Sequence, residues 1–143
     1  LDGKGRMALP ARNRETLQFA CEGKIVVTID MREPCLLLYP LPDWEVVQGK
    51  LEGLSNINPQ ARMLQRLLIG HATDLELDAN GRVLIPALLR EYAKLEKKVV
   101  LVGQGNKIEL WAEQEWRERM EGWLNSESPS ALDTGELFDG LSL

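Results

Sequence analysis

Apolar residues recur along this chain with two different spacings, which predict a succession of short strands and helices. Apolar, β-branched runs and strict alternation predict strands, and the segments with this pattern are Arg6–Leu9, Lys24–Ile29, Cys35–Tyr39, His71–Leu77, Arg82–Ile85, Lys98–Val102 and Ile108–Trp111. Helical spacing, in three cases with proline at the first helical position, predicts helices at Pro10–Cys21, Asp43–Leu54, Pro59–Ile69, Pro86–Leu95 and Glu113–Leu124. Gly70 is the expected C-cap of the third helix. The mixture predicts an α+β fold.

The sequence contains an internal repeat. Residues 1–15 align with residues 77–91 without a gap, and eight of these 15 positions are identical. The register continues into the later strands, where Leu38-Tyr39 matches Leu110-Trp111. Each copy therefore predicts a β-α-β-β-α unit. The repeat also predicts a strand just before Leu1, equivalent to His71–Leu77, and we expect this strand to lie outside the sequence or to be disordered.

The length of the chain limits how many domains it can form, and its charge limits the kind of partner that it can bind. The chain has 143 residues and 44% hydrophobic residues, which is enough for one compact domain or two small ones packed together. Its net charge of -5 argues against a general nucleic-acid binder. However, residues 112–143 hold eight acidic and two basic side chains, a charge of -6, so residues 1–111 carry +1. The first 15 residues carry +2, which permits anion binding at that end.

The side chains needed for catalysis are scarce. His71 is the only histidine, so a Ser–His or Cys–His pair and a histidine-rich metal site have little to draw on. Gly3-Lys4-Gly5 lacks the glycine spacing of a phosphate-binding loop. Cys21 and Cys35 have no metal-binding spacing and are expected to be buried free thiols in a reducing cytosol. No apolar run is long enough to cross a bilayer. We therefore expect no enzyme activity, cofactor, metal, membrane partner or small-molecule substrate.

A D-x-x-x-R element occurs in both copies of the repeat, at Asp2–Arg6 and Asp78–Arg82, with glycine immediately before the arginine. Over a glycine turn the carboxylate can return to the guanidinium, so the aspartate could fix the arginine's direction or cap the N–H groups of the turn. The alternative is an ion pair that only stabilises the turn and binds no ligand. The spacing leaves both interpretations open.

The surroundings distinguish the two copies. Besides its D-x-x-x-R element, the first copy carries the cations Lys4, Arg12 and Arg14. The second copy has Asn80, Leu88 and Leu89 at the aligned or neighbouring positions. The first copy is therefore expected to meet phosphate. The second copy is expected to pack against protein, with a structural or auxiliary role for its charged residues Asp78, Arg82 and Arg90.

Several segments together resemble the MraZ family of bacterial regulators. They are the duplicated L-D-x-x-G-R element with its following P-x-x-x-R, and the segments Cys35–Trp44, Arg66–Ala72 and Val102–Trp111. The resemblance implies two tandem swapped-hairpin SpoVT-AbrB halves that form a pseudo-dimer within the chain, with flanking helices. It also implies assembly into rings, cytoplasmic location at the nucleoid, and repression of the promoter of the division and cell-wall gene cluster, including the protein's own gene.

The resemblance further implies binding to direct repeats of double-stranded DNA through the N-terminal D-x-x-x-R face. The residues expected there are Asp2, Lys4, Arg6, Arg12 and Arg14. Arg6 is the candidate for a base edge and the other cations for the phosphate backbone. The expected organisation is a first SpoVT-AbrB domain over 1–45, linking helices over 46–70, a second domain over 71–117, and a helix end with a weakly structured acidic tail over 118–143.

Three other functions stay open at this point. An AbrB-like antitoxin would bind DNA and also neutralise a toxin. A structural ring or adaptor would use the D-x-x-x-R pairs only as turn clamps and would lack specific DNA binding. A small enzyme is disfavoured by the missing catalytic side chains. The acidic C-terminal block is either a solvated helix face or a source of repulsion that keeps DNA on another face of the protein.

Overall fold

The computed structural model describes residues 1–125, apart from the side chains of residues 19 and 20. The described residues divide into two units, residues 1–113 and residues 114–125. The predicted weakly structured tail lies outside the described residues, except for Asn125, which forms a turn after the last helix.

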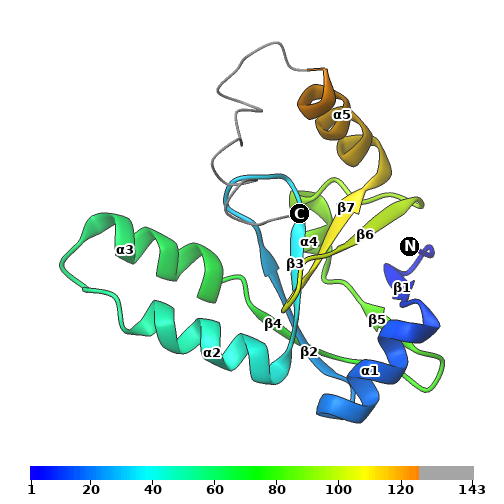
Figure 1. The fold of residues 1–143 in the computed structure, drawn as a ribbon, viewed down its shortest axis with the longest axis horizontal. Coiled ribbons are helices and arrows are strands. Elements are labelled where there is room, and N and C mark those ends of the chain that lie inside the picture. Colours follow the sequence, from blue (N-terminus) through cyan, green and yellow to red (C-terminus); the bar gives the residue numbers. More distant parts are fainter. Residues whose placement is uncertain (126–143) are drawn as a thin grey trace, which may run out of the picture. The chain divides into compact units, whose positions relative to one another are not determined.

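The elements follow the predicted order (Figure 1). The strands are β1 (Arg6–Ala8), β2 (Lys24–Ile29), β3 (Leu36–Pro40), β4 (Thr73–Glu76), β5 (Arg82–Leu84), β6 (Val99–Gly103) and β7 (Ile108–Ala112). The helices are α1 (Ala11–Cys21), α2 (Leu41–Glu52), α3 (Pro59–Leu64), η1 (Gln65–Ile69), α4 (Ala87–Tyr92) and α5 (Glu113–Leu124). Each predicted strand and helix within the described residues is therefore present.

Helix ends differ from the prediction for local reasons. Pro10 and Pro86 are N-caps with ψ of 146° and 145°, so each helix begins one residue later than predicted. Helix α4 ends at Tyr92 because Lys94 has φ 55°, a left-handed conformation that stops a helix. Helix α2 begins at Leu41, directly after Pro40 and two residues earlier than predicted.

The single helix predicted over Pro59–Ile69 changes from an α-helix to a π-helix at Gln65. Gly70 ends it, as predicted, but in a right-handed conformation with φ −62°. A Cβ at this position would lie 2.1 Å from the carbonyl oxygen of Arg66, so the close approach of the backbone requires glycine here.

The two copies of the repeat interleave in two antiparallel sheets. One sheet has the order β4-β2-β3-β7-β6, and the other is a two-stranded ribbon of β1 and β5. Leu37 faces Glu109 across β3 and β7, and Met7 faces Val83 across β1 and β5. Each of these pairs joins equivalent positions of the repeat, so an approximate two-fold axis relates the halves. The expected swapped-hairpin pseudo-dimer is confirmed.

The main core lies between one face of the larger sheet and the β1–β5 ribbon with α1 and α4. Its buried residues include Met7, Leu9, Val83, Ile85 and Leu110, each at most 3% exposed. Val26, Leu37, Tyr39 and Trp44 form a second cluster on the other face of the sheet, against α2. Strands β2 and β3 are buried on both faces, which explains their uninterrupted apolar runs.

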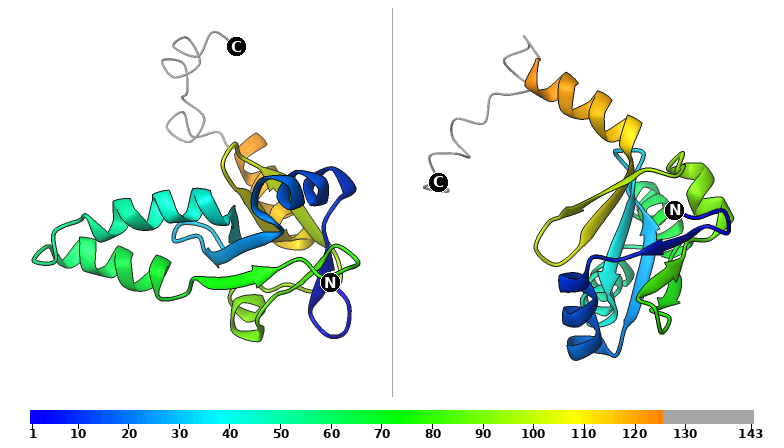
Figure 2. Two further views of the ribbon diagram at one scale, coloured as in Figure 1. Left: turned by 90° about the horizontal axis from the view of Figure 1, so that it is seen from below. Right: turned by 90° about the vertical axis from the view of Figure 1, so that its right-hand side faces the viewer.

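The segment Leu41–Ile69, which we call the helical arm, runs out along α2 and returns along α3 and η1 (Figures 1 and 2). Gln65 Nε2 donates a hydrogen bond to the carbonyl of Leu51 at 2.8 Å and joins the two helices. Thr28 Oγ1 on β2 donates to the carbonyl of Leu68 at 2.6 Å and fastens the arm to the sheet. The range 46–70, for which linking helices are expected, overlaps this arm, and the domain bounds stay a prediction.

Candidate nucleic-acid interface

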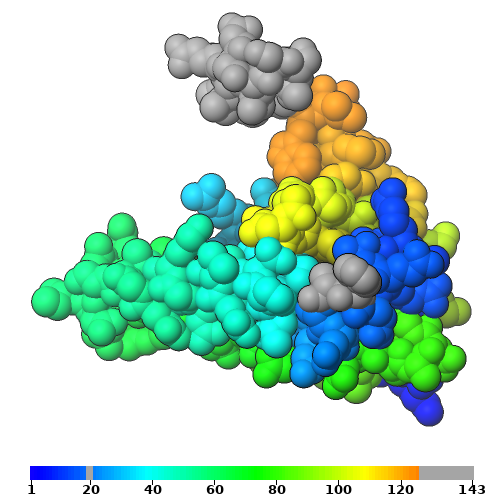
Figure 3. Space-filling model, turned by 60° about the horizontal axis from the view of Figure 1, so that its bottom comes forward, coloured from blue at the N-terminus to red at the C-terminus, as the bar shows by residue number. Residues whose placement is uncertain are grey.

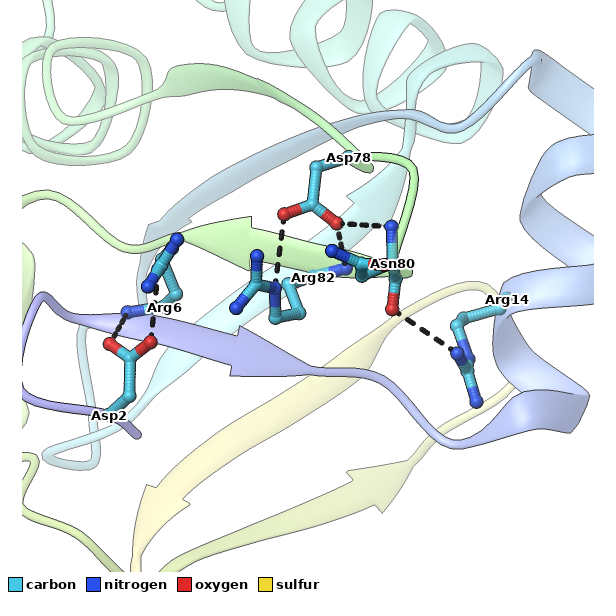
Figure 4. Close-up of polar contacts among 6 residues, drawn as sticks. All are labelled: Asp2, Arg6, Arg14, Asp78, Asn80 and Arg82. Carbon is cyan, nitrogen blue, oxygen red and sulfur yellow. Dashed lines mark hydrogen bonds and ion pairs between the residues drawn. The ribbon is translucent and has the colours of Figure 1, made fainter.

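The first D-x-x-x-R turn is closed by its own aspartate. Asp2 Oδ1 accepts hydrogen bonds from the amides of Lys4 and Arg6, both at 2.9 Å. Asp2 Oδ2 accepts one from Arg6 Nε at 3.0 Å, and Figure 4 shows both contacts with Arg6. Gly5 takes φ +83°, a conformation that L side chains rarely adopt. Asp2 thus caps the turn amides and also fixes the direction of the Arg6 guanidinium.

The second turn repeats this arrangement. Asp78 Oδ1 accepts from the amides of Asn80 at 2.8 Å and Arg82 at 2.9 Å, and Oδ2 accepts from Arg82 Nε at 3.1 Å. Gly81 has φ +72°. The local sequence therefore folds into the same turn twice, although only the first copy carries a lysine at its tip.

Hydrogen bonds lower the pKa of both aspartates. The amide of Arg6 is the main cause for Asp2, whose pKa falls from 3.8 to about 2, with smaller contributions from the Lys4 amide and the Arg6 side chain. The amide of Arg82 is the main cause of the lowered pKa of Asp78. Both carboxylates are therefore charged at neutral pH, which is the state that holds each guanidinium in place.

The β1–β5 ribbon presents both arginines on its outer face. Met7 and Val83 point into the core, so their alternating neighbours point outward. Arg6 lies across from Leu84, and Arg82 lies across from Ala8. The Arg6 and Arg82 side chains are 32% and 30% exposed. The ribbon therefore carries two fixed guanidinium groups on one exposed surface.

Each of these arginines keeps donors for a ligand. A guanidinium has five N–H donors, and the aspartate of the turn uses only the one on Nε. Among the described residues, no group accepts a hydrogen bond from the Nη atoms of Arg6 or Arg82. Four donors on each arginine are thus available for the planar, paired recognition of phosphate oxygens or a guanine edge.

The other predicted cations lie in two different environments. Lys4 is exposed at the tip of the first turn, and Arg12 is exposed on α1. Arg14 is half-buried, and its Nη1 donates to the carbonyl of Asn80 in the second turn at 3.3 Å (Figure 4). Arg90, the equivalent of Arg14, lies against Gly5 in the first turn. One signal of these contacts is present in the sequence, since both arginines and both glycines are identical positions of the repeat.

Among the described residues, one other group of potential metal ligands lies outside the ribbon. Asp30, Cys35 and Glu109 have ligand atoms within 4.8 Å of one another. Glu109 Oε1 accepts a hydrogen bond from Trp111 Nε1 at 3.0 Å. Burial is the main cause that raises the pKa of the Cys35 thiol, so this thiol stays protonated at neutral pH and is a poor nucleophile and ligand.

The comparison with known proteins agrees with the repeat. A family model described as "MraZ protein, putative antitoxin-like" matches residues 1–67 and again residues 68–136. The transcriptional regulator MraZ of Alkalilimnicola ehrlichii is 58% identical over 125 residues, which are 87% of this chain and 83% of the relative. The MraZ regulator of Idiomarina loihiensis is 51% identical over 143 residues, which are 100% of this chain and 94% of the relative. That of Yersinia pestis is 49% identical over the same coverage.

These matches cover the duplicated units and both D-x-x-x-R turns. Within residues 1–125, no helix combines the length and the apolar character needed to cross a bilayer. Two matches to one family model and about 50% identity over the full chain leave no ambiguity about descent. The chain belongs to the MraZ family of transcriptional regulators.

Proposed function

We propose that this protein represses transcription by binding direct repeats of double-stranded DNA in the promoter of the division and cell-wall gene cluster, which includes its own gene. In this proposal the protein acts as a homo-oligomeric ring in the cytoplasm, at the nucleoid. The observation that carries the proposal is the β1–β5 ribbon, whose outer face holds two guanidinium groups fixed by aspartates.

A two-stranded ribbon suits the major groove of B-DNA, which is about 12 Å wide. Arg6 would read a guanine edge through its Nη donors, because arginine to guanine is the commonest specific contact in that groove. Asp2 would contribute indirectly by holding the Arg6 guanidinium. Arg82 and Asp78 on the same ribbon would have an auxiliary role, which keeps the ranking of the two copies that the sequence suggests.

Exposed cations beside the ribbon would contact the phosphate backbone. Lys4 at the tip of the first turn and Arg12 on α1 are the candidates, because both side chains are exposed. Contacts of this kind fix the register of a protein on DNA and make its affinity depend on salt. The local charge of +2 over residues 1–15 supports this role in a chain whose total charge is -5.

Ring assembly would supply the affinity that one protomer lacks. A protomer with a few cations binds non-specific DNA with a Kd of about 10⁻⁴ to 10⁻⁶ M. A ring would present the same ribbon at fixed spacing to successive repeats. Linked contacts can raise affinity by roughly 10² to 10⁴ when the geometry allows simultaneous binding.

The test compares binding to the promoter repeats and to random DNA of equal length. Arg6→Ala should weaken promoter binding by about 5- to 150-fold, because it removes a base contact worth about 1 to 3 kcal/mol. Arg32→Ala, an exposed arginine in the β2–β3 loop, is the control with the same charge loss. Sedimentation should find the same oligomer for the wild-type protein, Arg6→Ala and Arg32→Ala. A larger loss in Arg82→Ala than in Arg6→Ala would contradict the ranking of the copies.

The same measurement separates the alternatives. A structural ring or adaptor would bind promoter and random DNA equally weakly, and a flat dependence of affinity on salt would contradict DNA binding altogether. An AbrB-like antitoxin would also bind DNA, so co-purification of a toxin partner with the full chain is the observation that would favour it.

A further inference from the structure

We infer that Arg14 and Arg90 are positioning residues: each fixes the D-x-x-x-R turn of the opposite half in its DNA-binding geometry and does not itself contact DNA. The inference rests on the proposed function, because it assigns both residues to the same interface. It gives Arg14 a different role from the phosphate contact that the sequence predicts.

Arg14 occupies the space beside the second turn. A Cβ built on Gly81 would lie 1.9 Å from Arg14 Cδ and 2.8 Å from its Nη1, so the arginine fills the volume that any other residue's side chain would need. The same Nη1 donates to the carbonyl of Asn80 at 3.3 Å. Helix α1 of the first half thus contacts the turn of the second half at two successive residues.

Arg90 makes the reciprocal contact from α4. A Cβ built on Gly5 would lie 2.6 Å from Arg90 Cζ and 2.7 Å from its Nε and Nη1. Because Arg14 and Arg90 are equivalent positions of the repeat, as are Gly5 and Gly81, the structure contains this contact twice. The packing contact is therefore present in both halves, whereas among the described residues only Arg14 adds a hydrogen bond to the opposite turn. The two halves lie next to each other on the surface shown in Figure 3.

Packing holds these guanidinium groups more than hydrogen bonds do. In the described part of the chain, the Nε atoms of Arg14 and Arg90 are buried and have no hydrogen-bond partner. A planar guanidinium can lie flat against a glycine backbone, which a lysine ammonium cannot imitate. An arginine that reached for a phosphate would have to leave this position and uncover the turn. We therefore assign both side chains to the turns and not to DNA.

The arrangement crosses over between the halves. Arg90 supports the turn that orients Arg6, and Arg14 supports the turn that orients Arg82. Loss of Arg90 should therefore affect the function of Arg6, although the two residues belong to different copies of the repeat. A residue's distance along the sequence from the DNA-contacting arginine is a poor guide to its importance here.

The first experiment needs no DNA. Amide hydrogen exchange, followed by NMR, reports the opening of each turn in the free protein. Arg14→Ala should accelerate exchange of the Gly81 and Arg82 amides, which donate to Asp78, and should leave the first turn unchanged. Arg12→Ala, a neighbouring exposed arginine on the same helix, is the matched control and should change neither turn. Equal exchange in Arg14→Ala and the wild-type protein would overturn the inference even if DNA binding is confirmed.

The second experiment is a double-mutant cycle on promoter affinity. Arg90→Ala should weaken binding by about 2- to 150-fold, the range of measured couplings between contacting residues. Its effect should disappear when Arg6 is already alanine and should persist when Arg82 is alanine. Additive losses of Arg90→Ala and Arg6→Ala would show that Arg90 acts by another route and would overturn the inference.

Salt dependence distinguishes positioning from direct contact. Each lost phosphate contact reduces the magnitude of the negative slope of log K against log salt by about 0.9. Arg14→Ala should weaken binding with an unchanged slope, whereas Lys4→Ala should reduce the slope. A reduced slope in Arg14→Ala would establish the phosphate contact instead. If the wild-type protein does not bind the promoter at all, the proposed function fails, and the exchange measurement alone decides whether the arginines position the turns.

Discussion

Met7 and Val83 face each other in register at the centre of the β1–β5 ribbon, and they are the same position of the internal repeat. The residues on either side of this pair are consequently related in the same way. One face of the ribbon closes the core and the other carries Arg6 and Arg82. The candidate interface is thus formed jointly by both halves of the chain.

Substitutions on the inward face of the ribbon should lower stability far more than substitutions on its outward face. Met7 is 3% exposed in the core, so Met7→Ala should lower the free energy of unfolding by about 2 to 5 kcal/mol through lost burial and a cavity. Leu84→Ala on the opposite face, where Leu84 is 54% exposed, should change it by no more than about 0.5 kcal/mol. Urea unfolding measures both values, and equal effects would contradict the assigned faces.

The turn glycines should not tolerate a side chain. Gly81→Ala would combine a left-handed φ of +72° with a Cβ placed 1.9 Å from Arg14 Cδ. A strained residue of this kind costs about 1 to 3 kcal/mol. Gly3→Ala is the control, because nothing lies within 4 Å of its added Cβ and its φ lies outside the left-handed range. A thermal or urea unfolding curve for Gly81→Ala that matches the wild-type curve would show that the turn is not as described.

Acid should loosen the first turn through Asp2. Its pKa is lowered from 3.8 to about 2, mainly by the amide of Arg6, so the native state favours the charged form. The stabilisation is therefore complete above about pH 4 and is lost as the pH falls toward 2. A carboxyl ¹³C NMR titration should give a midpoint near 2 for Asp2, and the lowered pKa of Asp78 shifts its midpoint in the same direction.

The control for this titration is Asp2→Asn, which removes the ionisable group and should make stability depend less steeply on pH between 4 and 2, while the contribution of Asp78 remains. A midpoint for Asp2 near its ordinary value of 3.8 would mean that the capping hydrogen bonds are absent in solution.

The attachment of the helical arm should depend on Thr28. Its side chain is fully buried, and its Oγ1 donates to the carbonyl of Leu68 at 2.6 Å. Thr28→Val keeps the shape but leaves that carbonyl without this donor, which should cost about 1 to 3 kcal/mol of stability. Thr16→Val, which removes a similar hydrogen bond on an exposed face of α1, should cost less. Chemical denaturation compares the two, and hydrogen exchange over η1 should show the local loosening.

The elements of the fold were largely predictable because they depend on local patterns. The spacing of apolar residues indicated each strand and helix, and the repeat indicated two units. Helix ends were less predictable. Lys94 adopts a left-handed φ of 55° where glycine or asparagine is usual, so its residue type does not signal that the helix ends there.

The sequence by itself determined the two D-x-x-x-R turns, since every hydrogen bond within each turn joins residues at most four apart. It could not determine that the turns share one ribbon, because the pairing of Met7 with Val83 spans 76 positions and depends on how the two halves pack. Nor could the sequence assign the role of Arg14, because its charge, considered in isolation, suggests a phosphate contact. Only the tertiary structure brings its guanidinium onto Gly81, because the contact forms between helices and turns from different halves of the chain.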